Sequence, residues 1–491
     1  MINQDKVKMW GDGMRLHELL KDVAKTNLPD MDISLITDNS KKVDVGCLFI
    51  CIKGEKFDGH SVAAEMLKKG AVAVVVQTDL GLDRQILVSD TREAYGKICA
   101  AWFGHPEEKL KLIGITGTNG KTTIANVVKH ILTHNGYKVG LIGTIQNEIG
   151  DTVIHANNTT PFTFEFMELL SKMVDAGCEY AVLEVSSFGL VQKRIGPAHF
   201  KIALFTNLTQ DHLDYHKDME EYYKAKRMLF NICDIAVCCI DDGYGERLFN
   251  EITCEKYSYS ITKKADYYAD VVKIKPNETS FWFCKRDKSH NVTMKMTGQF
   301  NVSNITGTIG ICLNLGLAIE DILKAIADYK GVRGRCEVIP TGRDFSVICD
   351  YAHTPDAIEN ILQNVRTYTE GRLICLFGCG GNRDKTKRPL MAKAAAKYSD
   401  MLIITSDNPR DEDPVAIIDD ILVGLEGKDI PYETVVDRKE AIYYALKTAR
   451  RGDIIVLAGK GHEDYQVLEN DVHIHFDERE VVSEGLKLLG N

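Results

Sequence analysis

The sequence predicts an α/β protein of three domains: a central parallel-sheet domain built on a phosphate-binding loop, a C-terminal Rossmann-like domain and a smaller N-terminal α/β domain. The chain has 491 residues, which is more than one hydrophobic core usually organises. Short apolar strands alternate with helical patterns along most of its length, as parallel sheets require. In Leu112–Thr123 a strand meets a helix through a turn with two glycines. We place the domains at residues 1–106, 107–330 and 331–491.

The N-terminal region has three predicted strands separated by helical patterns: Gly46–Ile52, Ala71–Val76 and Gln85–Val88. It also contains two polar turns, Asp38–Val43 and Gly54–His60. Turns of this kind often hold small ligands, although a plain connecting turn explains the same residues. The composition changes at Ala101–Glu108, which sets the first domain boundary.

A phosphate-binding loop is predicted at Gly117–Lys121. Lys109–Ile115 alternates lysine with apolar residues and predicts a strand, and the apolar spacing that follows the loop predicts a helix. The N–H groups of such a turn and the helix dipole favour an anion, so Lys121 is placed to contact the β- and γ-phosphates and Thr122 to bind Mg²⁺. Ile115 stands where the usual motif has its first glycine. An ordinary strand–turn–helix is the alternative, but its helix N-terminus would repel Lys121.

The rest of the central region continues the α/β alternation, with predicted strands Lys138–Ile142, Tyr180–Val185, Ile202–Phe205 and Ile235–Ile240. Ligands of open α/β sheets bind at the carboxyl ends of strands. The polar residues at those ends are Glu184, Ser186, Asn207 and Asp241. Tyr268–Met296 predicts short antiparallel strands, and a helix is predicted from near Gly298 to Leu315.

Three side chains of this region suit a metal–triphosphate site. Glu184 is a candidate Mg²⁺ ligand, although a solvated glutamate at a strand end has the same sequence signature. His212 is either a metal ligand or a hydrogen-bonded histidine. Lys226, on a predicted helix, is a cation near the expected metal, and that placement alone assigns it no role.

The C-terminal region, expected to begin near Gly331, has four strands that each end in a loop rich in polar residues. The strands are Phe345–Cys349, Leu373–Phe377, Met401–Thr405 and Asp453–Leu457. The loops are Asp350–Asp356, Gly378–Lys385, Ser406–Asp411 and Ala458–Glu463. This pattern predicts a second doubly wound sheet with its own binding edge.

Composition favours a cytoplasmic enzyme. The net charge of −10 argues against a nucleic-acid surface. The 14 cysteines are scattered without a C-x-x-C pair, which indicates neither a zinc site nor a disulfide framework and fits a reducing compartment. No apolar run approaches the ~20 residues of a membrane helix, and the N-terminus has no signal-peptide pattern. We expect a monomer that inserts into no membrane.

Six motifs follow one another along the chain: Gly117–Thr123, Asn158–Pro161, Glu184–Ser187, Asp211–His216, Tyr351–Asp356 and Asp407–Arg410. Together, and over essentially the whole chain, they resemble the Mur ligases of peptidoglycan synthesis. The resemblance implies that ATP phosphorylates the free side-chain carboxylate of D-glutamate in UDP-N-acetylmuramoyl-L-alanyl-D-glutamate. The amino group of meso-diaminopimelate would then attack the acyl phosphate.

The resemblance also implies roles around ATP. The residues implied to bind ATP are Gly117, Thr118, Asn119, Gly120, Lys121, Thr122, Thr123, Asn301, Asn304, Arg335 and Asp350. The implied Mg²⁺ ligands are Thr122, Glu184, His212 and Lys226, and the implied catalytic residues are Lys121, Glu184, His212 and Lys226. Lys226 would carry a carbamate derived from CO₂, which turns a cation into an anionic oxygen ligand.

Two further sets of residues are implied for the substrates. The UDP-sugar peptide would contact Ser40, the Glu55–Phe57 turn, Asn158, Thr159, Thr160, Ser186, Gln192 and Arg194. Diaminopimelate would contact Arg383, Asp407, Asn408, Pro409, Arg410, Gly459 and Glu463. Arg410 would bind the distal carboxylate through two parallel hydrogen bonds. The alternative is a surface arginine paired with Asp411 or Asp413.

Two residues depart from the family pattern: Phe188 stands where many such ligases have histidine, and Arg333 stands where proline is usual. The rival functions are the same ligation with L-lysine, a folylpolyglutamate synthase, a catalytically silent nucleotide-binding scaffold and a nucleic-acid motor. The N-terminal domain argues against the synthase. The presence of Lys121, Lys226 and His212 argues against the silent scaffold, and the acidic charge argues against the motor.

Overall fold

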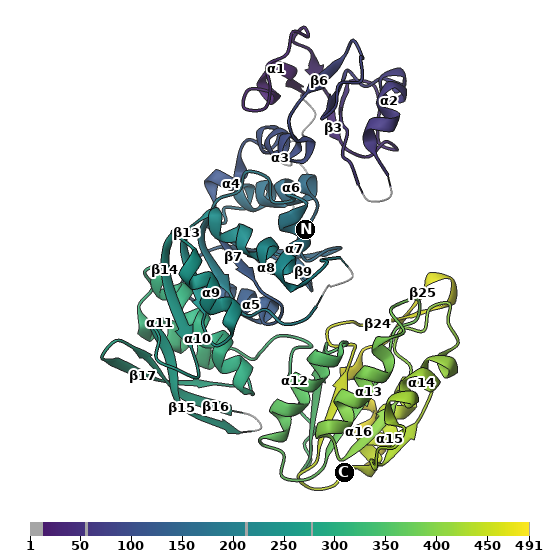
Figure 1. Cartoon of the computed structure of the whole chain (residues 1–491). Coiled ribbons are helices and arrows are strands. Elements are labelled where there is room, and N and C mark those ends of the chain that lie inside the picture. Colours follow the sequence, from purple (N-terminus) through teal and green to yellow (C-terminus); the bar gives the residue numbers. More distant parts are fainter. Residues whose placement is uncertain (1–12, 55–56, 212–214, 276–277, 491) are drawn as a thin grey trace. The chain divides into compact units, whose positions relative to one another are not determined.

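The computed structural model describes residues 13–54, 57–211, 215–275 and 278–490. They form two compact units. The first contains the chain up to Lys121, then Leu132–Cys238 and Asp242–Tyr257; the second contains Thr122–Ile131, Cys239–Asp241 and the chain from Ser258 onward. Both units are α/β, as the sequence predicts (Figure 1).

The first unit begins with a small parallel sheet of order β3-β4-β5-β6. Its strands are β3 (Leu35–Thr37), β4 (Cys47–Ile50), β5 (Ala73–Val76) and β6 (Gln85–Leu87), and its helices are α2 (Ala63–Lys69) and α3 (Thr91–Trp102). Successive side chains point to opposite faces. Phe49 therefore packs with Met66 of α2, whereas Leu48 joins the core that contains Ile98 of α3. The short elements β1 (Met14–Arg15), α1 (Leu16–Leu19) and β2 (Asp32–Ile33) precede this sheet.

The larger sheet of the first unit has the order β10-β9-β8-β11-β7-β12-β13. The strands are β7 (Lys111–Thr116), β8 (Val139–Ile142), β9 (Gln146–Ile149), β10 (Thr152–His155), β11 (Tyr180–Glu184), β12 (Phe200–Phe205) and β13 (Cys233–Cys239). The helices are α4 (Pro106–Lys109), α6 (Thr163–Asp175), α7 (Ser187–Val191), α8 (Met219–Arg227) and α9 (Gly243–Glu251). Strand β7 pairs in parallel with β11 and β12, with Glu184 opposite Ile115 and Phe205 opposite Thr116. The loops after these three strands therefore open at one edge.

The second unit contains most of α5 (Lys121–His134) and an antiparallel segment. Its elements are the second half of β14 (Glu255–Ser260), β15 (Tyr267–Lys275), β16 (Glu278–Lys285), β17 (Lys288–Met294), α10 (Gln299–Asn314) and α11 (Ile319–Asp328). Antiparallel pairing of β15 with β16 and of β16 with β17 confirms the prediction for residues 268–296.

The C-terminal sheet, also in the second unit, has the order β18-β19-β23-β20-β21-β22 and is parallel except for β18. Its strands are β18 (Glu337–Ile339), β19 (Ser346–Asp350), β20 (Leu373–Phe377), β21 (Met401–Ile404), β22 (Tyr432–Thr434) and β23 (Ile454–Ala458). One face packs on α12 (Pro355–Arg366), α13 (Lys387–Tyr398) and α14 (Pro414–Leu422); the other packs on α15 (Arg438–Thr448) and α16 (Glu478–Leu488). A hairpin of β24 (Tyr465–Leu468) and β25 (Val472–His475) extends beyond it. Helices on both faces confirm the doubly wound sheet.

The sequence-based prediction was wrong at Lys109. This residue lies in α4, and the strand begins at Lys111. Pro106 occupies the first turn of α4, where its missing N–H costs no hydrogen bond, and the chain leaves the helix only at Leu110. The hairpins β9–β10 and β24–β25 and strand β22 were not predicted. Most residues of β10, β22 and β25 are solvent-exposed, and β9 and β24 each bury a single residue, so none of these strands has a buried apolar face.

Candidate functional site

The phosphate loop is fixed by a glycine conformation and by the end of a neighbouring strand. Gly117 has φ of 141°, and a Cβ there would come within 1.8 Å of Thr206 Oγ1, so only glycine fits. After β12, Asn207 accepts hydrogen bonds from the N–H of Thr118 and, through Oδ1, from the N–H of Asn119, both at 2.9 Å. The polar residue noted at this strand end therefore holds the loop.

Two lysines meet at this loop. Lys121 Nζ donates to the carbonyl oxygens of Gly117 and Thr118, both at 2.9 Å, and Lys226 Nζ donates to Gly117 O at 2.8 Å. Lys226 comes from α8, is 2% exposed, and lies 4.5 Å from the ring centroid of Tyr222. Burial and the positive charge of Lys121 lower the pKa of Lys226 well below its ordinary value, although Asp211 acts in the opposite direction. This environment favours a neutral amine.

Glu184, the last residue of β11, is held by a residue that the sequence did not single out. Thr144 donates its N–H to Glu184 Oε1 at 2.9 Å and its hydroxyl to Oε2 at 3.0 Å. A Cβ at Gly143 would lie 2.5 Å from Oε1, so this glycine allows the close approach. Glu184 is 1% exposed, and a buried carboxylate with a fixed orientation suits a cation ligand.

Five of the residues implied for the UDP-sugar peptide form one hydrogen-bonded group in the first unit: Thr159, Thr160, Ser186, Gln192 and Arg194. Thr160 donates its hydroxyl to the carbonyl of Glu184 and accepts the N–H of Ser186, each at 2.9 Å. Arg194 donates to Thr160 O at 2.8 Å and to Gln192 Oε1 at 2.8 and 3.0 Å. The hydroxyl of Thr159 lies 3.0 Å from that of Thr144. Asn158 precedes Thr159, and Ser40 lies in the turn after β3 of the small sheet, half-buried.

A small pocket beside this group contains residues that sequence reasoning missed. Gln192 and Arg194 line it together with Asp38, Arg92 and Tyr95 of the N-terminal region. Asp38 opens the polar turn Asp38–Val43 that the sequence singled out, whereas no sequence motif marks Arg92 and Tyr95, which lie about one turn apart on α3. His212, Glu55 and Lys56 lie outside the described residues, and Phe57, the rest of that turn, is exposed.

The remaining ATP-binding candidates lie in the second unit. Arg335 Nη2 is 3.4 Å from Thr122 Oγ1, and its guanidinium lies 5.0 Å from the ring centroid of Tyr351. Asp350 accepts the N–H groups of Cys336 and Ala352 at 2.6 and 2.8 Å, which fixes its carboxylate at the end of β19. Burial raises the pKa of Asp350, and the Arg335 charge opposes that effect. Asn301 and Asn304 are buried on α10 and bond to each other at 3.2 Å.

The residues implied for diaminopimelate gather at the carboxyl ends of β20, β21 and β23. Asn408 Nδ2 donates to Glu463 Oε2 at 3.1 Å, and a Cβ at Gly459 would lie 2.7 Å from Asp407 Oδ2. Lys460, which the sequence analysis passed over, is 0% exposed and lies between these carboxylates, 3.2 Å from Asp407 Oδ1 and 3.1 Å from Glu463 Oε2.

Arg410 does not form the ion pairs considered for it. Among the described residues, its hydrogen bonds use Nη1 alone, to Gly381 O at 3.0 Å and to Asn408 O at 3.5 Å, and no ion pair joins it to Asp411 or Asp413. Its Nε and Nη2 remain available for a bidentate contact. Arg383 lies in the adjoining loop, and Gly381 N donates to Asn408 O across the two loops at 2.9 Å. Pro409 lies between Asn408 and Arg410 in this loop.

The two departures from the family pattern have local explanations. The ring of Phe188 packs 4.1 Å from that of Tyr215 and 5.8 Å from that of His216, measured between centroids, so it joins an aromatic cluster. Arg333 donates to Asp477 Oδ2 at 2.6 Å, an ion pair that a proline would lose.

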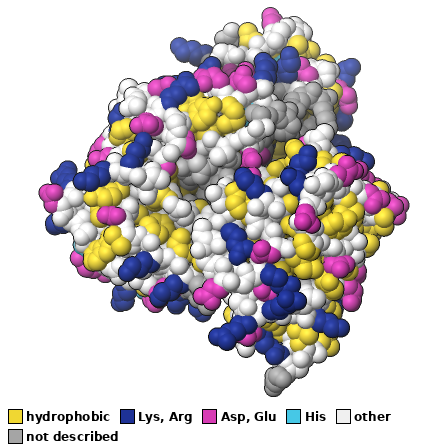
Figure 2. All heavy atoms as spheres, turned by 60° about the horizontal axis from the view of Figure 1, so that its bottom comes forward, with side chains coloured by type: hydrophobic (Ala, Val, Ile, Leu, Met, Phe, Trp, Pro, Cys, Tyr) yellow, Lys and Arg dark blue, Asp and Glu magenta, His cyan; other side chains and the backbone are white. Residues whose placement is uncertain are grey.

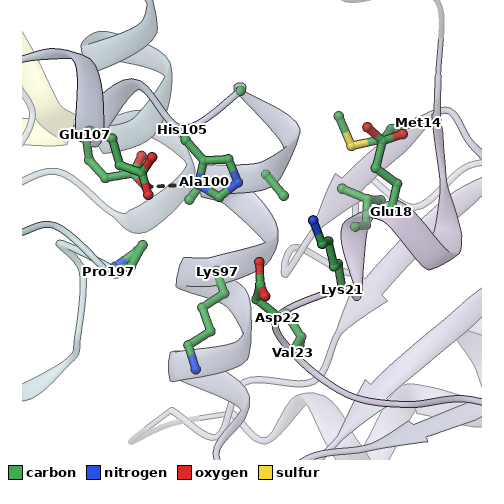
Figure 3. A pocket seen from close by; sticks show the side chains of 14 residues that line it. Met14, Glu18, Lys21, Asp22, Val23, Lys97, Ala100, His105, Glu107 and Pro197 are labelled. Carbon is green, nitrogen blue, oxygen red and sulfur yellow. Dashed lines mark hydrogen bonds and ion pairs between the residues drawn. The ribbon is translucent and has the colours of Figure 1, made fainter.

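Figure 3 shows a cavity of about 520 Å³ in the first unit. Helix α1 and the segment after it contribute Glu18, Lys21 and Asp22, while His105 and Glu107 face each other on the other wall, with Nδ1 and Oε1 3.2 Å apart. None of the predicted site residues lines it.

Comparisons with known proteins agree along the chain. Residues 115–312 match the family described as Mur ligase middle domain. Residues 334–461 match the family described as Mur ligase, glutamate ligase domain. Residues 32–103 match the family described as Mur ligase family, catalytic domain.

Full-length relatives carry a more specific name. UDP-N-acetylmuramoyl-L-alanyl-D-glutamate--2,6-diaminopimelate ligase 1 of Clostridium acetobutylicum is 46% identical, over 97% of this chain and 100% of the relative. The ligase of the same name, without the number, from Clostridium tetani is 42% identical over 97% of this chain and 100% of the relative. A solved structure of a protein with that name matches with a TM-score of 0.73 at 29% identity, covering 98% of this chain and 100% of that one.

Proposed function

Because the chain belongs to the Mur ligase family, we propose that it joins meso-diaminopimelate to the D-glutamate of UDP-N-acetylmuramoyl-L-alanyl-D-glutamate, driven by ATP, in peptidoglycan synthesis. The relatives that match nearly the whole chain carry this reaction in their names. The structural observation that best supports it is the loop at which Lys121 and Lys226 share one carbonyl oxygen close to the end of a parallel strand. The ammonium of Lys121 at the start of α5 suits a polyphosphate, and the neutral amine of Lys226 suits conversion to an anionic metal ligand.

The chemistry explains why ATP is required. A carboxylate is a poor electrophile, so its oxygen first takes the γ-phosphoryl group of ATP to give an acyl phosphate and ADP. The amine of the incoming amino acid then attacks the carbonyl carbon, and inorganic phosphate leaves. Phosphoryl transfer depends on positioning and charge neutralisation, the role we assign to Lys121 and the loop N–H groups of Gly117–Thr123.

The oxygen donors present fit Mg²⁺, which prefers carboxylate and hydroxyl ligands. We assign Glu184 and the hydroxyl of Thr122 to the metal, together with His212 and Lys226. When bound, Mg²⁺ neutralises phosphate charge during the transfer. Thr144 orients the carboxylate of Glu184 through its two hydrogen bonds.

Lys226 is assigned as a carbamate. A neutral amine attacks the carbon of CO₂, the N–C bond forms, and one proton leaves the nitrogen, so the product carries one negative charge. The burial of Lys226 and its lowered pKa support this, because they favour the uncharged nucleophile. The product is an anionic oxygen ligand beside the phosphate loop.

The two substrates are assigned to the two further groups of residues. Ser40, Asn158, Thr159, Thr160, Ser186, Gln192 and Arg194 are proposed for the UDP-sugar peptide. Arg383, Asp407, Asn408, Pro409, Arg410, Gly459 and Glu463 are proposed for diaminopimelate, and Asn301, Asn304, Arg335 and Asp350 for the nucleotide. The distal ammonium of diaminopimelate would meet Asp407 and Glu463, and its carboxylate would meet Arg410.

We also propose that the protein acts as a cytoplasmic monomer without a nucleic-acid partner. No disulfide joins its cysteines, all of which lie in the described part of the chain. Among the described residues, no helix is long and apolar enough to cross a membrane. Basic and acidic side chains are interspersed over the face shown in Figure 2, unlike a basic nucleic-acid surface. Light scattering of the purified chain tests the oligomeric state.

One assay separates the candidate activities. Purified protein is incubated with ATP, Mg²⁺ and UDP-N-acetylmuramoyl dipeptide, with meso-diaminopimelate, with L-lysine or with no amino acid. ADP release and a UDP-tripeptide product that both require diaminopimelate are expected. Product formation with L-lysine at equal efficiency would overturn the assignment of diaminopimelate as the amino-acid substrate. Release of ADP only with a folate and glutamate would indicate a folylpolyglutamate synthase instead.

A further inference from the structure

The residues proposed to bind diaminopimelate, called the amino-acid pocket below, surround a completely buried lysine to which the family resemblance gave no role. Lys460 follows Gly459 in the loop after β23 and is 0% exposed. Its Nζ donates to Asn408 Oδ1, to Glu463 Oε2 at 3.1 Å and to Tyr465 O at 2.9 Å, and it lies 3.2 Å from Asp407 Oδ1.

These contacts use the ammonium fully. An ammonium has three N–H donors, and the three hydrogen bonds to Asn408, Glu463 and Tyr465 occupy all of them. Lys460 therefore has no donor left for a substrate. Its contacts instead join three side chains proposed to bind diaminopimelate, Asp407, Asn408 and Glu463, which come from two loops far apart in the sequence.

The same contacts set the charge of the pocket. Asp407 and Glu463 carry two negative charges, and Lys460 cancels one of them. Arg410 contributes a second positive charge from the loop after β21. Arg438 also lies near Asp407 but is paired with Glu478 at 2.7 Å, so its charge is already balanced. These four side chains sum to zero, which matches a substrate end that is itself neutral overall; Arg383, also assigned to diaminopimelate, is exposed, so solvent screens its charge.

The ionisation of Asp407 agrees with this arrangement. Burial alone would raise the pKa of Asp407, but the nearby charges of Lys460 and Arg438 lower it below its ordinary value. Without the lysine, two neighbouring buried carboxylates would repel each other and attract a bare cation.

We propose that Lys460 is a positioning and specificity-determining residue: it fixes Asp407, Asn408 and Glu463 and sets the pocket charge so that a substrate end bearing an ammonium together with a carboxylate is preferred over a lone ammonium. This rests on the proposed function, in which the pocket takes diaminopimelate. The distal end of diaminopimelate carries both groups, whereas L-lysine offers only the ammonium.

The test compares the two amino acids in the full chain at pH 8.5. Lys460→Met keeps a chain of similar length and removes the charge. The ratio of kcat/KM for diaminopimelate to that for L-lysine should fall at least about tenfold, through KM for the amino acid, as loss of electrostatic complementarity predicts. KM for ATP and for the UDP-substrate should stay within about twofold of wild type, since neither is proposed to contact this loop.

A matched control is Arg372→Met. Arg372 is paired with Asp453 at 2.6 Å at the amino ends of β20 and β23, the opposite end of the sheet from the pocket. The Arg372→Met substitution removes a paired cation from the same domain, so it should lower stability. It should leave the ratio of kcat/KM for diaminopimelate to that for L-lysine unchanged.

The double variant Lys460→Met/Glu463→Gln covers the case in which the single variant does not fold, because it removes the carboxylate that would be left without its cation. Its pocket charge again sums to zero, so its ratio should return to within about threefold of wild type if charge sets the preference. A ratio in Lys460→Met within twofold of wild type overturns the inference, and so does a double variant whose ratio stays tenfold low.

The wild-type measurement separates the two hypotheses. A wild type that prefers diaminopimelate, with variants that do not change the ratio, overturns this inference alone. A wild type that prefers L-lysine, or that uses neither, overturns the proposed function and this inference with it.

Discussion

Two buried lysines in different regions of the molecule have opposite surroundings. Lys226 lies at the phosphate loop, 2% exposed, with a carbonyl oxygen and an aromatic ring as neighbours and with the charge of Lys121 close by. Among the described residues, no carboxylate forms an ion pair with it. Lys460 lies in the amino-acid pocket, 0% exposed, with the carboxylates of Asp407 and Glu463 at 3.2 and 3.1 Å.

The difference separates a reactive lysine from a structural one. Burying an ammonium is expensive unless anions and hydrogen-bond acceptors compensate for the lost water. Lys460 has that compensation and remains a cation that organises its neighbours. Lys226 lacks it, so the neutral amine is favoured, and a neutral amine can be converted to a carbamate. Under the proposed carbamylation of Lys226, the two sites use the same side chain for different chemistry.

The largest expected effect comes from removing the reactive lysine. Lys226→Ala should lower kcat by about 10³-fold or more, equivalent to about 4 kcal/mol of transition-state stabilisation. A short carboxylic acid such as acetate should restore part of the activity, because it replaces the anionic oxygen ligand. The measurement is steady-state ADP release with and without acetate.

Lys224→Ala is the control for that variant. Lys224 lies on the same helix, α8, but its side chain is 66% exposed and its contact with Glu220 is a long 3.9 Å, so its loss should change little. Near-wild-type turnover by Lys226→Ala without acetate would contradict the assignment of Lys226 as a carbamylated lysine that activity requires.

The next effect concerns the amino-acid pocket. Arg410→Ala should lower kcat/KM for diaminopimelate about 10²- to 10⁴-fold, because two hydrogen bonds to a carboxylate, each worth roughly 1.5–3 kcal/mol, are lost. The wild type should prefer diaminopimelate over L-lysine by a similar factor. KM for ATP should not change. The exposed Arg451, in the same domain, provides the control Arg451→Ala. Equal efficiency with both amino acids in the wild type would contradict the carboxylate assignment.

Sequence patterns predicted the phosphate site better than the amino-acid pocket. The spacing of Gly117, Gly120 and Lys121 between a strand and a helix is a local signal, and the loop has the predicted form. The predicted strands of both large sheets also agree with the structure to within a few residues, because apolar runs report burial directly.

What escaped prediction depends on contacts between distant segments. In the sequence Lys460 is a lysine in a glycine-rich loop, with nothing to distinguish it from an exposed one. Its burial comes from Asp407 and Asn408 on another strand end. Thr144 was missed for the same reason, since its partner Glu184 lies on a different strand. The roles of such residues follow from topology, which joins β7, β8 and β11 in one sheet.

A smaller effect should appear in the stability of the amino-acid domain at low pH. His462 lies beside Lys460, with its ring 4.7 Å from that of Tyr351 and its Nδ1 buried without a partner among the described residues. Burial, with the charges of Arg335, Arg333 and Arg479, lowers the pKa of His462 to about 4. The surroundings of His462 are thus partly buried and positively charged, so they disfavour a further cation.

The sign of the pH effect follows from this lowered pKa. As pH falls below the ordinary histidine value near 6.5, the unfolded chain takes up a proton before the folded one, so stability present above pH 6.5 is lost towards pH 4. The loss is at most about 3 kcal/mol, from about 1.4 kcal/mol per pKa unit. His462→Phe, which keeps a ring against Tyr351, should show a smaller loss of urea stability between pH 7 and pH 4.5. Equal losses in the two proteins would show that His462 titrates normally.

The smallest expected effect tests how the phosphate site holds its carboxylate. In the amino-acid pocket a buried cation positions Asp407 and Glu463, whereas Glu184 receives the neutral N–H and hydroxyl of Thr144. Thr144→Val keeps the shape and the backbone N–H; it removes one hydrogen bond to a charged group and the hydroxyl contact with Thr159, so the assay uses saturating UDP-substrate. That bond is worth roughly 1.5–3 kcal/mol at most, so the Mg²⁺ concentration for half-maximal activity should rise about five- to tenfold. At saturating Mg²⁺, kcat should stay within about threefold of wild type, since the carboxylate itself remains. Thr144→Ser retains the hydroxyl and should behave as wild type. An unchanged Mg²⁺ dependence in Thr144→Val would mean that the backbone N–H alone is enough to orient Glu184, because the hydroxyl is the only polar group the substitution removes.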